Sequence, residues 1–287
     1  MELGVVWAKT EEIVEARPAH AAEHLSRLTW EAPAGLAGIH LSYRTRGRLR
    51  LNGGVRYLAH ARDGTLVNLD YLDATTAAVT HRSVSPSDLV GASWELSADV
   101  MLVEETRGEV FLRSFARVGY RGTYHAWAAR GGEYQYPGSQ GRFADDEELV
   151  RYLVLHQVFD VGAFVELGAA RDGLYGRLGG AVSFLPTVDD RDTHILSDTD
   201  YYNTYRRGWY VRPEVAVGVR LGRGSAVEAF YEPSWQLPFK ETGTKIKTAS
   251  GVYVPEEKPN YRMTLHRVGI RLLLPASLPQ PRAAASR

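Results

Sequence analysis

Two short stretches of this chain carry residues that could do acid–base chemistry on a bound substrate. DDRDTHIL (189–196) places three carboxylates and one histidine within six residues, and VNLDYLDATT (67–76) contains Asn68 and Asp70. A histidine beside a carboxylate can act as a general base on water, and a carboxylate on the opposite side can hold that water. This chemistry requires that the fold bring the two stretches together.

The first stretch has two simpler interpretations. Oxygen-rich loops bind Ca²⁺, so Asp189, Asp190, Asp192 and His194 could form a metal site, although their spacing matches no standard calcium loop. An Asp-x-His in a polar loop can also face solvent without any function. We expect no bound metal and no other cofactor held by this stretch.

The composition excludes several classes of protein. Lys+Arg and Asp+Glu are both 34, so the chain has no basic surplus of the kind that nucleic-acid binders carry. There is no cysteine, which rules out disulfides and thiolate metal sites. Sixteen tyrosines, six tryptophans and 28 glycines favour strands and tight turns over helices.

Several segments alternate between apolar and polar residues, which is the pattern of a strand with two different faces. In WYVRPEVAVGVRL (209–221) one face is wholly apolar and the other is charged or small. Ten such segments are expected, most of them longer than strands of soluble sheets. They lie at about 2–15, 24–43, 47–61, 91–105, 109–128, 148–168, 172–187, 200–221, 225–238 and 260–274.

The connections alternate between short and long. The short ones are 44–47, 105–108, 169–173 and 222–225, and the long ones are 16–23, 62–90, 129–147, 188–199 and 239–259. An even number of strands with tight turns at one end and long loops at the other is typical of an outer-membrane barrel. We therefore predict an all-β fold, a ten-stranded antiparallel transmembrane β-barrel with long extracellular loops and short periplasmic turns. Residues 1–275 would form this single domain and 276–287 a flexible C-terminal tail.

Two features inside strands need a local explanation. The Ala-Pro-rich stretch at 32–34 is interpreted as a bulge, and Pro213 interrupts a strand in which it cannot donate a ladder hydrogen bond. On the polar faces, charged residues are expected to pair across a narrow lumen; they are Arg113, Arg117, Arg220, Glu228 and Glu232.

On this topology DDRDTHIL falls in the loop after the seventh strand and VNLDYLDATT in the loop after the third. The two loops can face each other across the mouth of the barrel. The chain here resembles the omptins, a family of ten-stranded outer-membrane proteases with an Asp-His couple facing an Asp-x-Asp pair. The resemblance rests on the order and spacing of KTEEIVE (9–15), LSRLTW (25–30), VNLDYLD (67–73), GYRGTYHAWAARGGEYQY (119–136) and DDRDTH (189–194).

The resemblance implies a role for each matching residue. Asp192 would orient His194, His194 would take a proton from water, and Asp70 would bind that water from across the cleft. Glu12 and Asp190 match the acidic residues that hold a basic side chain before the scissile bond, and a pair of recessed carboxylates favours Arg or Lys. The expected partners are peptides or proteins with basic residues, the bacterial outer membrane and lipopolysaccharide, with the active-site loops facing outside.

The chain departs from the family pattern at two places. Asn68 stands where the family has the first acid of its pair, and an amide can neither share a proton nor add negative charge, so we expect weakened activity. A shifted alignment would let Asp73 or Asp63 take that place. Tyr120 fits the lipopolysaccharide site of the outer wall, but Gly122 and Tyr124 stand where charged partners are expected, so a requirement for lipopolysaccharide as activator stays open.

Three functions are compatible with these observations. The first is an endopeptidase that cleaves after Arg or Lys, attenuated by Asn68. The second is a catalytically inactive barrel that binds cationic peptides or host surfaces as an adhesin. The third, a passive pore, is disfavoured because ten strands leave little lumen and the inward charges would fill it.

Overall fold

The computed structural model describes residues 1–16, 20–45, 47–169, 173–206, 208–221, 225–254 and 259–274. The tail predicted at 276–287 lies outside these residues. The described chain is built of β-strands joined by turns and short irregular segments. No helix in it has the length and apolar character needed to cross a membrane.

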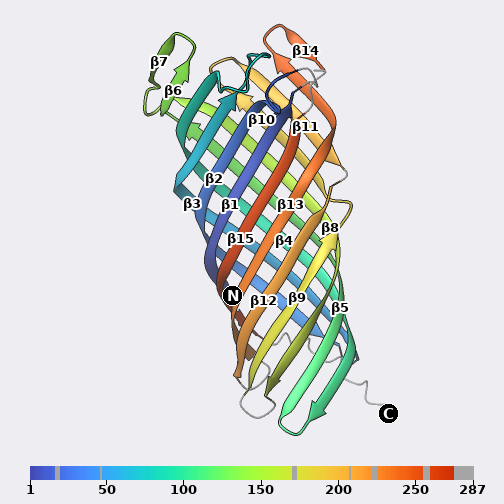
Figure 1. The fold of residues 1–287 in the computed structure, drawn as a ribbon. Helices are drawn as coiled ribbons and strands as arrows, with labels where there is room; N and C mark the ends of the chain where they lie inside the picture. Colours follow the sequence, from blue (N-terminus) through green and yellow to red (C-terminus); the bar gives the residue numbers. More distant parts are fainter. Residues whose placement is uncertain are drawn as a thin grey trace, which may run out of the picture.

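The described strands close into one antiparallel ring of ten, because β15 at the end of the chain pairs with β1 at its start (Figure 1). The ring runs in chain order through β1 (Glu2–Glu15), β2 (His24–Arg44), β3 (Leu49–Asp70), β4 (His81–Arg107), β5 (Val110–Arg130) and β8 (Glu148–Ala169). The seventh strand is β9 (Leu174–Ser183) continued by β10 (Thr187–His194), and the eighth is β11 (Thr199–Arg206) continued by β12 (Tyr210–Leu221). It ends with β13 (Ser225–Thr248) and β15 (Pro259–Leu273). The predicted fold class is therefore confirmed.

Small hairpins extend one end of the barrel. β6 (Glu133–Tyr136) pairs with β7 (Ser139–Arg142) and with β4, and β14 (Gly251–Tyr253) pairs with the end of β13. Figure 1 shows all three at the upper end, above the ring. The short turns between β2 and β3 and between β4 and β5 lie at the opposite end.

Several strands are longer than the sequence predicts. The segment 62–90 was expected to be a loop, but β3 continues to Asp70, β4 begins at His81, and the two residues are cross-strand partners. The stretch 189–194 also lies on a strand, β10, and not in the loop predicted for it. The alternating pattern fades in these extensions because both faces of the sheet are polar there, while the backbone ladder continues unchanged.

An apolar band surrounds the middle and the short-turn end of the barrel. Its exposed residues include Leu3, Val5, Ile39, Leu41, Val55, Leu96, Phe159, Leu178, Val217 and Ile270. On β1 the outward-facing residues change from Leu3, Val5 and Trp7 to Lys9 and Glu11. This change marks the upper edge of the surface suited to lipid contact.

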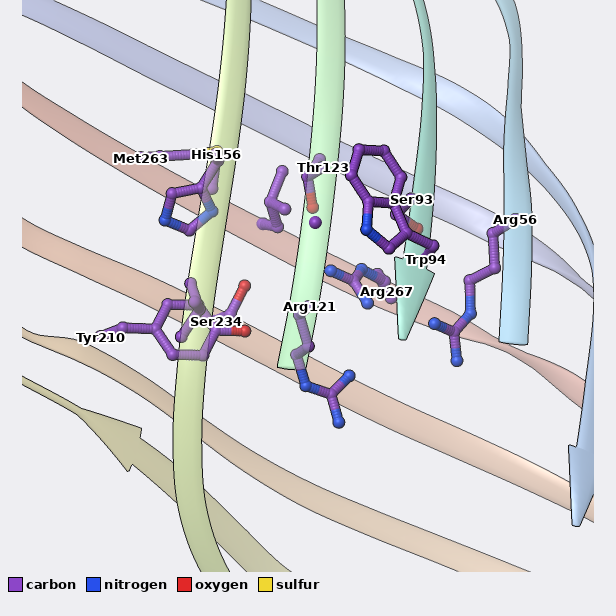
Figure 2. Close-up of a pocket in the computed structure, with 13 residues that line it drawn as sticks. Arg56, Ser93, Trp94, Arg121, Thr123, His156, Tyr210, Ser234, Met263 and Arg267 are labelled. Atoms are coloured by element: carbon purple, nitrogen blue, oxygen red, sulfur yellow. The ribbon is translucent and has the colours of Figure 1, made fainter. Parts of the chain in front are cut away.

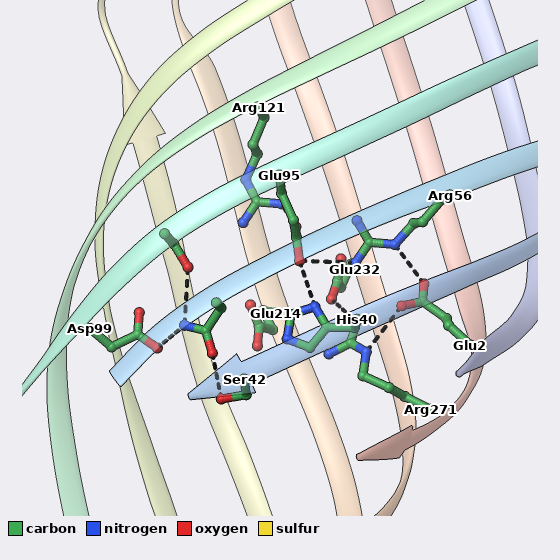
Figure 3. Close-up of polar contacts among 12 residues, drawn as sticks. Glu2, His40, Ser42, Arg56, Glu95, Asp99, Arg121, Glu214, Glu232 and Arg271 are labelled. Carbon is green, nitrogen blue, oxygen red and sulfur yellow. Dashed lines mark hydrogen bonds and ion pairs between the residues drawn. The ribbon is translucent and has the colours of Figure 1, made fainter. Parts of the chain in front are cut away.

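Paired charges fill the lumen inside this band (Figure 3). Glu2 accepts a hydrogen bond from Arg56 at 2.8 Å and one from Arg271 at 3.1 Å, and Glu95 lies between Arg56 and His40. Three of the charges predicted for the lumen join such pairs: Arg117 with Asp99, Glu228 with Arg177, and Glu232 with Arg271. Near the rim, Arg113 pairs with Glu104, and Arg220 lies 4.2 Å from the centroid of the Phe111 ring.

The charged layer of the lumen ends at a small cavity, and the lumen above this cavity is mainly apolar. A cavity of about 10 Å³, room for about one water molecule, lies among Arg56, Arg121, Arg267, Tyr210 and Ser234 (Figure 2). Above it, Trp30 stacks on Tyr152 with ring centroids 5.9 Å apart and lies 5.8 Å from the ring of Trp127. These fully buried aromatic rings form the floor beneath the polar upper end of the barrel.

Both local irregularities that the sequence indicated appear in the strand pairing. The register of β2 with β3 shifts between Glu31 and Leu36, the stretch that contains Pro33. Pro213 pairs with Gly180 of β9, but the pairing of β12 with β13 is interrupted after Val211 and resumes only at Val215. Since proline has no N–H to donate, one of its two ladders must be incomplete.

Candidate active site

The candidate residues gather inside the barrel at its upper end, beyond the apolar band. Glu12 lies on β1, five residues past Trp7, and its side chain is 7% exposed. Asp190, Asp192 and His194 lie on β10, at alternate positions that share the inner face. Strand geometry produces this arrangement, because side chains two residues apart point to the same side of the sheet.

Asp192 and His194 form a hydrogen-bonded pair. The Nε2 atom of His194 lies 2.9 Å from Oδ2 of Asp192, a carboxylate that is 2% exposed, while 30% of the His194 side chain is accessible. A neutral imidazole that donates from Nε2 keeps a lone pair on Nδ1, which can accept a proton. The pair therefore has the arrangement of an oriented general base.

The carboxylates around His194 favour its protonated form. Burial by itself lowers the pKa of His194, but the charge and hydrogen bond of Asp192 and the charge of Asp70 together raise it above its usual value. A base with a raised pKa binds a proton more firmly when it takes one from water.

Glu12 and Asp190 are two buried acids that interact electrostatically beneath this pair. Asp190 accepts hydrogen bonds from the Tyr152 hydroxyl at 2.7 Å and from the Asn203 amide at 2.9 Å. The Oε2 atom of Glu12 is buried and has no hydrogen-bond partner among the described residues. One carboxylate is thus anchored, and the other has a free oxygen.

Burial and neighbouring acids shift the protonation of both Glu12 and Asp190. Burial raises the pKa of Asp190 to about 8, and the charge of Asp192 raises it further. The hydrogen bonds from Tyr152 and Asn203 lower this pKa but do not offset burial. Burial and the charges of Asp190 and Asp192 also raise the pKa of Glu12 well above its usual range. A guanidinium or ammonium group placed here would remove this penalty.

Asp70 and Asn68 lie on the opposite wall, on β3. Asp70 accepts a hydrogen bond from the Ser26 hydroxyl at 2.7 Å, and its charge acts on the ionisation of both His194 and Tyr201. Asn68 is paired with Leu28 of β2, which is in turn paired with Glu12 of β1. The Oδ1 atom of Asn68 is buried without a partner among the described residues.

Asp63 and Asp73, the two acids that a shifted alignment would put in place of Asn68, do not lie beside Asp70 in the way that Asn68 does. Asp63 is exposed and lies at the irregularity of β3 between Ala61 and Gly64, seven residues before Asp70. Asp73 lies in the turn after β3, where it accepts hydrogen bonds from the backbone N–H and the hydroxyl of Thr75.

The geometry also bears on the metal interpretation. Asp189 points to the outer face of β10, where it accepts a hydrogen bond from Thr204, so it cannot join Asp190 and Asp192 around one ion. Among the residues that the structure describes, no group of three or more histidine or acidic side chains could hold a metal ion.

Tyr120 lies on the outer wall of β5, within the apolar band. Its hydroxyl donates to Gln157 at 3.0 Å, and its ring lies 4.8 Å from that of Phe159. The next outward position is Gly122, where a Cβ atom would collide with the Trp94 indole at 2.0 Å. The wall beside Tyr120 is thus aromatic at the position where a charged group was expected.

Four residues of the site were not singled out from the sequence. They are Tyr152, Tyr201, Tyr205 and Asn203, which surround the acids. The signal for three of them is the alternation in TDYYNTYR (199–206), where Tyr201, Asn203 and Tyr205 share one face of β11.

The fold resembles a known protease. The outer membrane protease OmpT from Escherichia coli superimposes with a TM-score of 0.77 at 16% sequence identity, over 94% of this chain and 93% of that one. The transport unit of the autotransporter AIDA-I from E. coli aligns over 94% of this chain and 90% of that one at 7% sequence identity. Its TM-score of 0.38 supports no inference.

The sequence comparisons give a sharper assignment. No curated protein sequence matches this chain. The model of the omptin family matches residues 1–251, which is most of the chain. The chain therefore belongs to the omptin family and is a bacterial outer-membrane protein.

Proposed function

We propose that this protein is an outer-membrane endopeptidase that cleaves peptide bonds on the carboxyl side of Arg or Lys. The observation that carries the proposal is the hydrogen-bonded Asp192–His194 pair above two buried carboxylates that have no cationic partner among the described side chains. The pair supplies a base, and the carboxylates supply a pocket for a basic side chain. The active-site end would face the outside of the cell.

His194 and Asp70 would activate one water molecule between the two walls. Nδ1 of His194 takes a proton from the water as the water oxygen bonds to the scissile carbonyl carbon, and the π electrons of the carbonyl move to its oxygen. When the tetrahedral intermediate collapses, the C–N bond breaks and the imidazolium gives its proton to the leaving nitrogen. Such proton transfers contribute about 10²–10⁴-fold in rate.

Asp192 and Asp70 would assist without bonding to the substrate. Asp192 fixes the ring of His194 and stabilises the imidazolium, and Asp70 accepts a hydrogen bond from the water. Asn68 beside Asp70 can hydrogen-bond to the water but adds no charge. We therefore propose that the native rate is low because one acid of this wall is missing.

Glu12 and Asp190 would select the residue before the scissile bond. An entering guanidinium would bind the free oxygen of Glu12 and the anchored carboxylate of Asp190, and the planar fork of Arg suits two carboxylates better than the single ammonium of Lys. The partners are thus peptides or proteins with exposed basic residues. Lipopolysaccharide could contact the wall at Tyr120, where aromatic contacts replace the expected charges.

A second candidate function rests on Asn68. If the amide abolishes water activation, the same cleft would bind cationic peptides without cleaving them. The chemistry of Asn68 favours this alternative, because an amide can accept a hydrogen bond from water but adds no negative charge beside Asp70.

A fluorogenic Arg-Arg peptide, assayed with and without lipopolysaccharide, tests the proposal. The variant Asn68→Asp should raise the rate about ten-fold or more, and adding His194→Ala should remove that gain. A chelator should change neither rate. Tight binding of the peptide with no cleavage by either the native protein or Asn68→Asp would select the binding protein.

A further inference from the structure

One aromatic residue of the site has no part in the mechanism so far. Tyr201 is the cross-strand partner of Asp192, on β11, and its side chain shares the inner face with Asn203 and Tyr205. Its ring centroid lies 5.1 Å from that of His194, with the ring planes inclined at 56°. Tyr201 thus touches the proposed base from the neighbouring strand.

The charges of acids on three strands act on Tyr201. Burial is the main cause that raises the pKa of Tyr201, and the phenol of Tyr253 adds to it, followed by the charges of Asp192, Glu12 and Asp70. Within the described part of the chain, the structure gives this hydroxyl no hydrogen-bond partner. Tyr201 is therefore a donor that stays protonated, with its ring against the proposed base.

Such a donor is needed at this place. Attack by water puts a negative charge on the carbonyl oxygen, and four of the groups around the cleft, Glu12, Asp70, Asp190 and Asp192, are acids that would repel it when ionised. Enzymes stabilise this oxyanion with hydrogen-bond donors fixed in advance. Asn68 carries an N–H₂ group, but it lies on the wall of Asp70, where the water is held.

We propose that Tyr201 is a further catalytic residue, whose phenolic hydroxyl donates a hydrogen bond to the oxyanion formed when water attacks the scissile carbonyl. This rests on the proposed endopeptidase function. The hydroxyl keeps its proton throughout the cycle, so the proton balance between water, His194 and the leaving nitrogen is unchanged. Contact with His194 keeps the donor next to the position where the carbonyl must lie.

The test is Tyr201→Phe, which removes one oxygen and keeps the ring against His194. In the Asn68→Asp background we expect kcat to fall about 100-fold and KM to change less than two-fold, because the lost bond exists only in the transition state. The matched control is Tyr202→Phe. Tyr202 is the next residue, faces outward and donates to Asp200 at 3.2 Å, so its loss should leave both constants unchanged.

A binding measurement separates this proposal from the proposed function. A phosphinic Arg-Arg peptide carries an anionic oxygen where the oxyanion forms, and the matching peptide with two methylenes in place of the scissile amide does not. Tyr201→Phe should weaken binding of the phosphinic peptide about 100-fold and leave the methylene peptide unaffected. Equal binding of the phosphinic peptide by both proteins, or a change in KM with kcat intact, would overturn the role of Tyr201. Absence of cleavage with the expected difference in binding would instead overturn the peptidase activity alone.

Discussion

Replacing Asp190 with Asn should make the protein more stable and less active. The pKa of Asp190 is raised from its ordinary range to about 8, chiefly by burial. A carboxyl whose pKa is raised by folding stabilises the fold fully below the unfolded-state pKa, and this stability is lost as pH rises through the folded-state pKa. The native barrel should therefore lose stability between about pH 4 and pH 8, because in this range the carboxyl ionises in the unfolded chain but stays protonated in the folded barrel.

The size of the effect follows from the two pKa values. With an unfolded-state pKa near 3.9, the cost at pH 7 is about 4 kcal/mol as an upper limit, and it vanishes near pH 4. Asn is close in shape to the protonated acid, and its carbonyl oxygen can accept the hydrogen bond from Tyr152 or from Asn203. Asp190→Asn should thus raise the melting temperature by several degrees at pH 7 and leave it unchanged at pH 4.

Thermal unfolding in detergent micelles, followed by far-ultraviolet circular dichroism at pH 4 and pH 7, measures this difference. Asp189→Asn is the matched control, because its side chain is 43% exposed on the outer face of the same strand. The control should show little change at either pH. Equal melting temperatures of Asp190→Asn and the native barrel at pH 7 would refute the argument that burying this acid destabilises the barrel. They would also refute the argument that a bound cation would stabilise it.

Three further predictions follow from the same geometry. Binding of an Arg peptide at pH 7 should release about one proton from Glu12 and Asp190, because the raised pKa of Asp190 keeps it protonated in the empty site. Calorimetry in two buffers of different ionisation enthalpy measures this release, and no release would contradict a protonated empty site. The kcat/KM for peptide cleavage should fall as pH drops through a pKa above 6.5, because His194, whose pKa is raised, becomes protonated and can no longer act as a base. A pH-independent kcat/KM would exclude His194 as the base. Trp30→Ala should destabilise the barrel by about 3–5 kcal/mol, since the ring is fully buried against Trp127 and Tyr152, and a change below about 1 kcal/mol would show that this floor is loosely packed.

The strand pattern predicts the ring well where lipid faces one side of the sheet. There the contrast between apolar and polar residues is strong, as in 209–221, and the predicted segment is close to the strands observed. Above the band that contrast disappears, so the sequence pattern predicts loops at the end of β3 and over β10, although the backbone pairing continues there.

The site itself was only partly visible in the sequence. The sequence predicts a loop at Asp190, Asp192 and His194, and these residues share one face because the stretch is a strand, β10. The position of Tyr201 opposite Asp192 could not be read from the sequence, because it depends on the length of the turn between β10 and β11. That turn contains Asp198 with a φ of 46°, a conformation that Asp adopts more readily than most residues.

The pairing of the lumen charges could not be predicted either. Some acids pair with more than one arginine, as Glu228 does with Arg177 and Arg271, and only the closed ring decides which arginines are neighbours. The pairing of β15 with β1 closes that ring, and these two strands are far apart in the sequence.

The most direct test of a water shared by the two walls is a double-mutant cycle on peptide cleavage. It compares His194→Ala, Asp70→Asn and their combination, all in the Asn68→Asp background, by kcat/KM for the Arg-Arg peptide. If both residues act on one water molecule, the double variant should be no slower than the slower single variant. Losses that multiply in the double variant would mean that His194 and Asp70 act on separate steps, which would contradict a mechanism built on one shared water.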